Sequence, residues 1–186
     1  MILIDDYEDM AAMAVLRDID PQDRLEAQAV RGEVVTHLSL FGDWRAARPM
    51  HALSLIIRDR ASHEPIALLA LANTGQAGVA SAALVARNHR RYRRQLAALA
   101  RVIRSDMPRF ARDAGIFRIE ARAWASHPRA SKFLQLVGFA HECVMPGFGR
   151  DGSEQFVQFA WTGRGQRDVH LQDAEGVGST TKDCGL

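Results

Sequence analysis

The chain has 186 residues, of which 47% are apolar and 25% are charged, and its formal net charge is +2. This apolar fraction is sufficient for a hydrophobic core, so the composition excludes a chain that is disordered throughout and predicts one domain. The small net charge excludes nucleic-acid binding driven by overall charge alone, and the two cysteines exclude a disulfide framework.

The apolar segments are too short for a membrane span, which requires about 18 continuous apolar residues. Residues 1–9 have neither the basic leader nor the apolar stretch of a signal peptide. With so few cysteines, a reducing interior is the default compartment. We therefore expect no membrane association and a cytoplasmic location.

The first quarter of the chain predicts a short strand at residues 2–4 followed by three helices. Asp20 followed by Pro21 is typical of a helix start, because aspartate accepts a hydrogen bond from an early amide and proline fits the first helical position. Apolar residues at helical spacing predict the third helix over residues 34–47.

In the middle of the chain the apolar residues no longer follow helical spacing. Residues 52–58 and 65–73 are apolar runs separated by a polar stretch, which is typical of an antiparallel hairpin, although their alanine content is also compatible with helix. A turn and a third strand over residues 79–86 follow.

A long helix is predicted over residues 88–114, because its apolar residues recur at helical spacing. Pro108 lacks a backbone donor and is expected to kink or split this helix. Gly115 ends it, and alternating apolar and charged residues predict a strand over residues 116–124.

The segment from residue 126 to residue 161 is the most informative part of the chain. It reads as a short helix, a strand, a turn at residues 149–152 and a closing strand. The helix is indicated by apolar residues spaced three and four apart, namely Ala130, Phe133, Leu134 and Val137. Gly138 suits the left-handed conformation that ends a helix.

This segment resembles the C-terminal half of the GNAT superfamily of N-acetyltransferases. In that family a helix with an Asn-x-x-Ala start and a Tyr-x-x-x-Gly-Phe end precedes the last two strands, and Ala130, Gly138 and Phe139 match it. His127 stands at the usual asparagine, and Leu134 stands at the tyrosine that often reprotonates the coenzyme thiolate. The resemblance implies acetyl transfer from acetyl-CoA to an amine by direct attack.

A narrower resemblance is to GNAT-like proteins of short-tailed phages, including internal virion proteins. The residues that carry it are Phe133-Leu134 and the run Pro146-Gly147-Phe148-Gly149. This resemblance implies a phage or prophage protein that acts in the host cytoplasm or is associated with the virion.

The order of elements indicates an α+β fold, and the resemblance implies a mixed, mostly antiparallel sheet flanked by helices. We expect one domain over residues 1–161. Residues 162–186 contain five glycines and few large apolar residues, so they are predicted to form a flexible tail.

The coenzyme loop of the family, Gln/Arg-x-x-Gly-x-Gly/Ala, binds pyrophosphate on backbone amides at a helix N-terminus. Here the corresponding stretch contains no glycine; Arg87 falls on the first position, and Arg90 and Tyr92 fall on the glycine positions. The candidate coenzyme-binding residues are Arg87, Asn88, Arg90, Arg91 and Arg94.

Five arginines at a predicted helix start oppose the helix dipole and repel one another, so an anion there would be stabilising. The arginines are Arg87, Arg90, Arg91, Arg93 and Arg94. Coenzyme phosphates, a nucleic-acid backbone and carboxylates of a partner protein are the three candidate anions, and a solvated basic face is the structural alternative. Nucleic acid is the weakest of the three, because only Tyr92 could stack on bases.

The candidate general bases are Glu120 and His127, with Glu142 as a weaker one. For Glu120 the favoured alternative is an ion pair with a neighbouring arginine, and for His127 it is a turn residue. Ser126 is expected to cap the following helix. The histidines and cysteines lack the spacings typical of metal ligands, so no metal site is expected.

Two functions from different classes remain open at this point. The chain is either an N-acetyltransferase with a changed coenzyme loop, or a non-catalytic virion or assembly protein that docks through its basic face.

Overall fold

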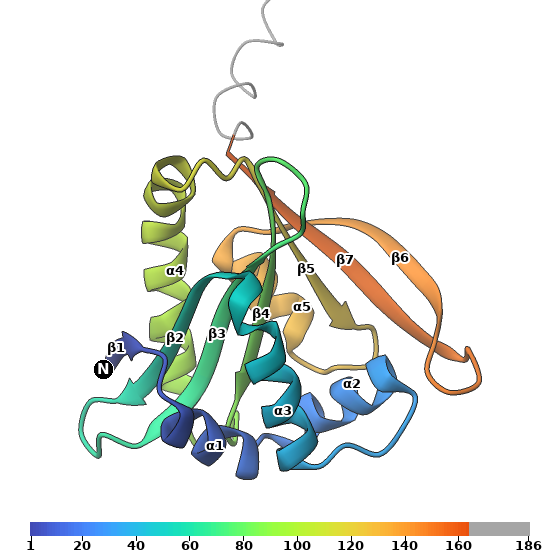
Figure 1. Cartoon of the computed structure of the whole chain (residues 1–186), viewed down its shortest axis with the longest axis horizontal. Helices are drawn as coiled ribbons and strands as arrows, with labels where there is room; N and C mark the ends of the chain where they lie inside the picture. Colours follow the sequence, from blue (N-terminus) through green and yellow to red (C-terminus); the bar gives the residue numbers. More distant parts are fainter. Residues whose placement is uncertain (164–186) are drawn as a thin grey trace, which may run out of the picture.

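The computed structural model describes residues 1–163, which form five α-helices and seven strands (Figure 1). Most of the predicted tail, residues 164–186, lies outside the described residues. Among the described helices, none combines the length and the apolar character needed to cross a bilayer.

The seven strands form one sheet in the order β1-β2-β3-β4-β5-β7-β6. Neighbouring strands are antiparallel except for β4 and β5, which are parallel. The strands are β1 (Ile2–Asp6), β2 (His51–Asp59), β3 (Pro65–Asn73), β4 (Val79–Ala86), β5 (Arg118–Trp124), β6 (Ala140–Phe148) and β7 (Glu154–Thr162). The mixed, mostly antiparallel sheet of an α+β fold is therefore confirmed.

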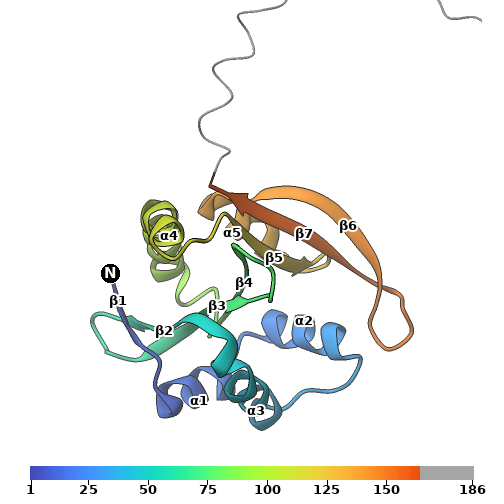
Figure 2. The same ribbon diagram turned by 45° about the horizontal axis from the view of Figure 1, so that its top comes forward.

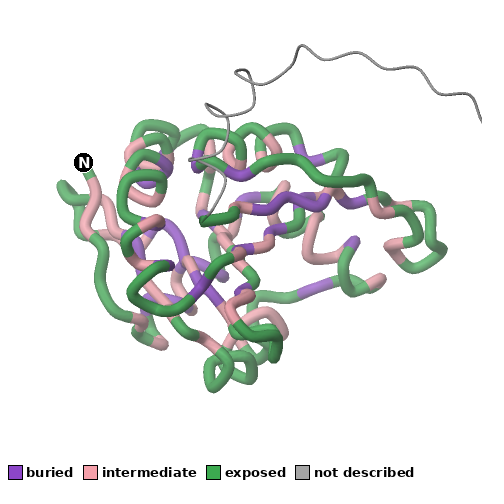
Figure 3. The backbone as a smooth tube through the Cα atoms, turned by 90° about the horizontal axis from the view of Figure 1, so that it is seen from above, coloured by how far each residue is buried: buried purple, intermediate pink, exposed green. Residues whose placement is uncertain are grey.

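Helices cover both faces of the sheet, as Figure 2 shows. On one face, α1 packs Val15 and Leu16 against Ile56 and Leu68 of the central strands. On the opposite face lie α4 and α5. The helices are α1 (Asp9–Arg17), α2 (Pro21–Arg31), α3 (His37–Ala47), α4 (Arg93–Asp113) and α5 (Ala130–Val137). Figure 3 shows the resulting burial, with buried segments along the central strands and exposed segments on the outer helix faces.

Local sequence signals explain several boundaries. The Asp20 side chain accepts a hydrogen bond from the Gln22 amide, so α2 begins where Asp20 and Pro21 predicted it. Gly138 ends α5 with a φ of 107°, a left-handed conformation that other residues adopt at a cost.

Other predictions about local structure were wrong. The predicted helix over residues 88–114 begins at Arg93 in the structure, and residues 88–92 form a turn. Pro108 lies inside α4, which runs on through it, so of the predicted kink or split the split does not occur. Ser126 does not cap α5; the ring of His127 takes that place, as described below.

Candidate functional site

The two parallel strands at the centre of the sheet diverge. Their ladder pairs Val79 with Arg118 and ends at Ser81 and Glu120, although β4 continues to Ala86. Because backbone groups of alternate residues point to the same edge of a strand, the amides of Ala82 and Leu84 face the opening that this divergence creates. Main-chain donors are thus presented to a bound molecule in the middle of the sheet.

Helix α2 lies across the far end of this opening. The Asp23 carboxylate accepts a hydrogen bond from the Ala86 amide at 2.8 Å, and the Glu26 carboxylate accepts one from the Trp124 amide at 3.1 Å. The ends of β4 and β5, which no longer pair with each other here, are therefore held by two acidic side chains of one helix.

Two histidines complete this cluster. Nε2 of His127 lies 3.1 Å from Oδ1 of Asp23, and Nε2 of His89 lies 3.2 Å from Oδ2 of the same carboxylate. The His89 amide also donates to Asp20 at 2.7 Å, which fixes the turn before α4. All of these side chains are largely buried.

The hydrogen bonds of His127 determine its tautomer. Its Nδ1 accepts from the amides of Ala130 at 2.9 Å and Arg129 at 3.2 Å, so this nitrogen carries no proton. The proton of the neutral ring is therefore on Nε2, which donates it to Asp23. With both nitrogens engaged, His127 caps α5 and positions Asp23, and it has no free lone pair with which to act as a base.

The same tautomer bears on metal binding. Asp23, His89 and His127 place three potential ligand atoms within 4.8 Å of one another. A metal on Nε2 of His127 would have to displace its proton while Nδ1 still accepts two amide hydrogen bonds. A neutral histidine ligand usually donates its other N–H to a partner, so this geometry favours a proton-bearing cluster.

The surroundings of the cluster shift the pKa values of its two carboxylates, Asp23 and Glu26, in opposite directions. Burial alone would raise the pKa of Asp23, but hydrogen bonds from His127, His89 and the Ala86 amide lower it overall. For His89, burial opposes the charged ring, but the hydrogen bond and charge of Asp23 raise its pKa. Burial, together with the neighbouring charge of Asp23, raises the pKa of Glu26 to about 7. Glu26 is therefore a carboxylate that can exchange a proton near neutral pH.

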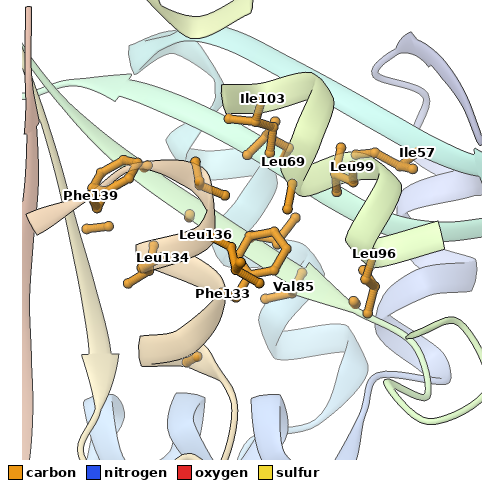
Figure 4. A pocket seen from close by; sticks show the side chains of 18 of the residues that line it. Ile57, Leu69, Val85, Leu96, Leu99, Ile103, Phe133, Leu134, Leu136 and Phe139 are labelled. Atoms are coloured by element: carbon orange, nitrogen blue, oxygen red, sulfur yellow. The ribbon is translucent and has the colours of Figure 1, made fainter. Parts of the chain in front are cut away.

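A large cavity opens from this cluster between the sheet and the helices α4 and α5 (Figure 4). Its volume is about 1230 Å³, and its lining includes Glu26, His89 and His127. At about 24 cal/mol per Å³, a sealed void of this size would cost about 30 kcal/mol, which exceeds the about 5–15 kcal/mol net stability of a domain. The space is therefore one that solvent or a ligand fills.

The predicted coenzyme-binding residues separate into two groups. Arg87 is held by Asp18 at 2.9 Å and by the Pro65 carbonyl, and Arg91 pairs with Glu64 at 3.3 Å. Arg90, Arg93 and Arg94 form no ion pair with any residue from 1 to 163.

Asn88 shapes the turn that precedes α4. It has a φ of 20°, and its Oδ1 accepts the Arg91 amide at 2.9 Å. Helix α4 has no side-chain cap, and its first helical hydrogen bond comes from Leu96. The amides of the first turn therefore remain available to an anion beside Arg90, Arg93 and Arg94.

Glu120 lies on β5 in an ion-pair network instead of standing free. Arg118 donates to Glu120 at 2.7 Å and to Glu142 at 2.8 Å. This is the alternative that the sequence favoured for Glu120. Glu26, in contrast, has no ion pair among residues 1–163 and lines the cavity at the end of the opening.

Sequence reasoning missed Asp23, Glu26 and His89. The acidic residues read as ordinary charges in the early part of an amphipathic helix, and no local pattern marks them. The one available signal was the position of His89 in the stretch that replaces the coenzyme loop.

Comparison with known proteins finds solved structures of similar fold but no protein that is similar in sequence. No protein-family model matches the chain, and no curated protein matches it in sequence. Among solved structures, an acetyltransferase of the GNAT family from Bacillus anthracis has a TM-score of 0.65 and 10% identity, covering 87% of this chain and 95% of the other.

Two further structures have similar statistics. An acetyltransferase from Salmonella typhimurium that modifies the N-terminal serine of ribosomal protein L7/L12 has a TM-score of 0.64 and 10% identity, covering 87% of this chain and 94% of the other. Spermidine N-acetyltransferase from Vibrio cholerae, in complex with CoA and spermine, has a TM-score of 0.60 and 11% identity, covering 87% and 95%. At these identities the likeness shows that this chain has the GNAT fold.

Proposed function

We propose that this protein is an N-acyltransferase that transfers an acyl group from a coenzyme A thioester to an amine. The observation that carries the proposal is the divergence of β4 and β5 directly beside the uncapped start of α4. The free amides of β4 can bind the arm of the coenzyme that carries the thioester, because this arm contains amide groups. The free amides at the start of α4 can bind its phosphates at the same edge of the sheet. The CoA complex of a structure with the same fold is in agreement with it.

The phosphate contacts would come from the start of α4. The amides of the first turn point along the helix axis, beyond its N-terminal end. Arg90, Arg93 and Arg94 have no ion partner among residues 1–163. Arg93 and Arg129 line the cavity. These cations would take over part of the role of the loop glycines, because charge at the helix start compensates in part for a less close approach of the phosphates to the backbone.

Glu26 is the proposed general base. The amine nitrogen attacks the thioester carbonyl carbon, the carbon–sulfur bond breaks, and the amine proton passes to the Glu26 carboxylate. Because thiols have a pKa of about 8.5, the CoA thiolate can leave and take a proton from solvent without the tyrosine that Leu134 replaces. Asp23 and His127 would position α2 so that Glu26 faces the cavity.

A non-catalytic role is the second candidate, and the loss of the loop glycines and of the tyrosine favours it. In this role the protein would be a phage or virion component in the host cytoplasm, and its free arginines would bind an anionic protein partner. The two candidates differ in their response to coenzyme A.

Calorimetric titration with CoA and acetyl-CoA, followed by a thiol-release assay, tests the proposal. The amine panel contains spermidine, amino acids and a peptide with N-terminal serine. We expect saturable binding, at least about tenfold weaker binding in Arg93→Ala with Arg94→Ala, and unchanged binding in the control Arg101→Ala on the same helix. Glu26→Gln should bind coenzyme but release no thiol. Absence of coenzyme binding at millimolar concentration refutes the proposal and favours the docking role.

A further inference from the structure

The floor of the cavity is a continuous apolar surface on three strands. Side chains of β2, β3 and β4 align across the sheet in register, with Leu55 opposite Leu69 and Leu69 opposite Leu84. These three leucines are on central strands beneath a helix, where a packed core would bury them completely. Each instead retains exposed surface, because the cavity lies above it.

The roof is mainly apolar as well, although charged side chains of α4 and α5, among them Arg109 and Lys132, also line the cavity. Figure 4 shows Leu96 and Ile103 of α4 and Phe133 of α5 directed into the same space as Leu69. These apolar side chains offer water no hydrogen-bond partners, and the cost of keeping an apolar space unfilled rises with its volume. At about 1230 Å³ the cavity exceeds the about 300–1,000 Å³ of most small-molecule sites.

The apolar space is continuous with the site already described. The lining of one cavity includes Glu26 and His127 at the divergence of β4 and β5, Arg93 at the start of α4, and the leucines beneath α4. A molecule that fits must therefore combine anionic groups, one reactive polar centre and a long apolar part.

We propose that this cavity holds the acyl chain of the donor, and that the donor is a medium- or long-chain acyl-CoA with at least eight carbons. This inference rests on the proposed function, since it specifies the thioester used at the same site. The phosphates lie at the start of α4, the thioester lies at the divergence of the strands, and the chain extends over the leucine floor. An acetyl group would leave this floor in contact with water.

Calorimetric titration with CoA, acetyl-CoA, octanoyl-CoA and decanoyl-CoA, each below its micelle concentration, tests the inference. Full burial gives up to about fourfold tighter binding per methylene, so we expect decanoyl-CoA to bind at least about 100-fold more tightly than acetyl-CoA. Equal affinities for the acetyl, octanoyl and decanoyl thioesters overturn the inference and leave the proposed function intact.

Two filling variants locate the chain. Leu69→Trp from the floor and Ile103→Trp from the roof should each weaken decanoyl-CoA binding at least about tenfold while leaving CoA binding nearly unchanged. Two variants are used so that one can be assessed if the other does not fold, as judged by circular dichroism. Leu38→Trp, an exposed leucine of α3 on the other face of the sheet, is the matched control and should change neither affinity.

Titration with free decanoate separates failure of the inference from failure of the proposed function. If no CoA compound binds but decanoate binds and Leu69→Trp abolishes it, the proposed function is refuted and the cavity remains an alkyl-chain site. If decanoate and all the thioesters fail to bind, both proposals are refuted.

Discussion

Replacing Glu26 with glutamine should make the protein more stable, and the gain should depend on pH. Glu26 is partly buried beside Asp23, and its pKa is raised from 4.5 to about 7. Glutamine has nearly the same shape as the protonated acid, and its side-chain oxygen can still accept the hydrogen bond of the Trp124 amide. The substitution therefore removes the burial of charge and keeps the contact.

The sign and size follow from the difference between the folded and unfolded pKa of Glu26. Below pH 4.5 the carboxyl is protonated in both states and costs nothing. As the pH rises from 4.5 to about 7, Glu26 ionises in the unfolded chain while it is still protonated in the folded protein, so the stability of the wild type falls; above about 7 it is ionised in both states and the loss is complete. A difference of about 2.5 pKa units corresponds to about 3 kcal/mol at full ionisation. Glu26→Gln should therefore gain up to about 3 kcal/mol above pH 8 and little near pH 5.

Urea denaturation of the wild type and of Glu26→Gln at several pH values measures this difference directly. Glu142→Gln is the matched control, because hydrogen bonds from Arg118 lower the pKa of Glu142. Its carboxylate stabilises the fold above the unfolded pKa, so this variant should lose stability at neutral pH and recover it in acid. A gain in Glu26→Gln that stays constant across the pH range would refute the reasoning.

Four further substitutions test the structure around the site and at the helix ends. Asp23→Ala leaves two histidines and a strand amide without their shared acceptor and should cost about 3–5 kcal/mol in urea denaturation, whereas a loss below about 1 kcal/mol would contradict its role. Gly138→Ala, at a φ of 107°, should lower the free energy of unfolding by about 1–2 kcal/mol. Gly42→Ala, inside α3 with open space around it, should raise it by about 0.5–1 kcal/mol. Equal effects of the two would argue against backbone strain at Gly138. Arg118→Ala should lose about 1 kcal/mol, and this loss should shrink in high salt if the bridge to Glu142 is the cause.

Much of the fold could be read from local patterns. Strand β4 has the bounds that its sequence predicted, the hairpin of β2 and β3 is antiparallel, and α2 begins at the capped proline. The start of α4 was placed five residues too early. Asp20 ties the amide of His89 into a turn there, and that contact spans 69 residues of sequence.

The candidate site was predicted only in part. The arginine-rich stretch lies at the start of α4, as expected, but Arg87 is bound to Asp18, and His127 uses both ring nitrogens for structure. No periodicity could reveal that Glu26, in an early helix, lies beside Trp124.

The sequence by itself determined the order and type of most elements, because caps, turns and apolar spacing act over a few neighbouring residues. Tertiary structure alone decided which carboxylate titrates near neutral pH and where the cavity lies. Both depend on burial, and burial is created by residues 98 to 104 positions apart, such as Glu26 with Trp124 and Asp23 with His127. A pKa and a cavity are properties of what surrounds a group, and the surroundings exist only once the sheet has formed.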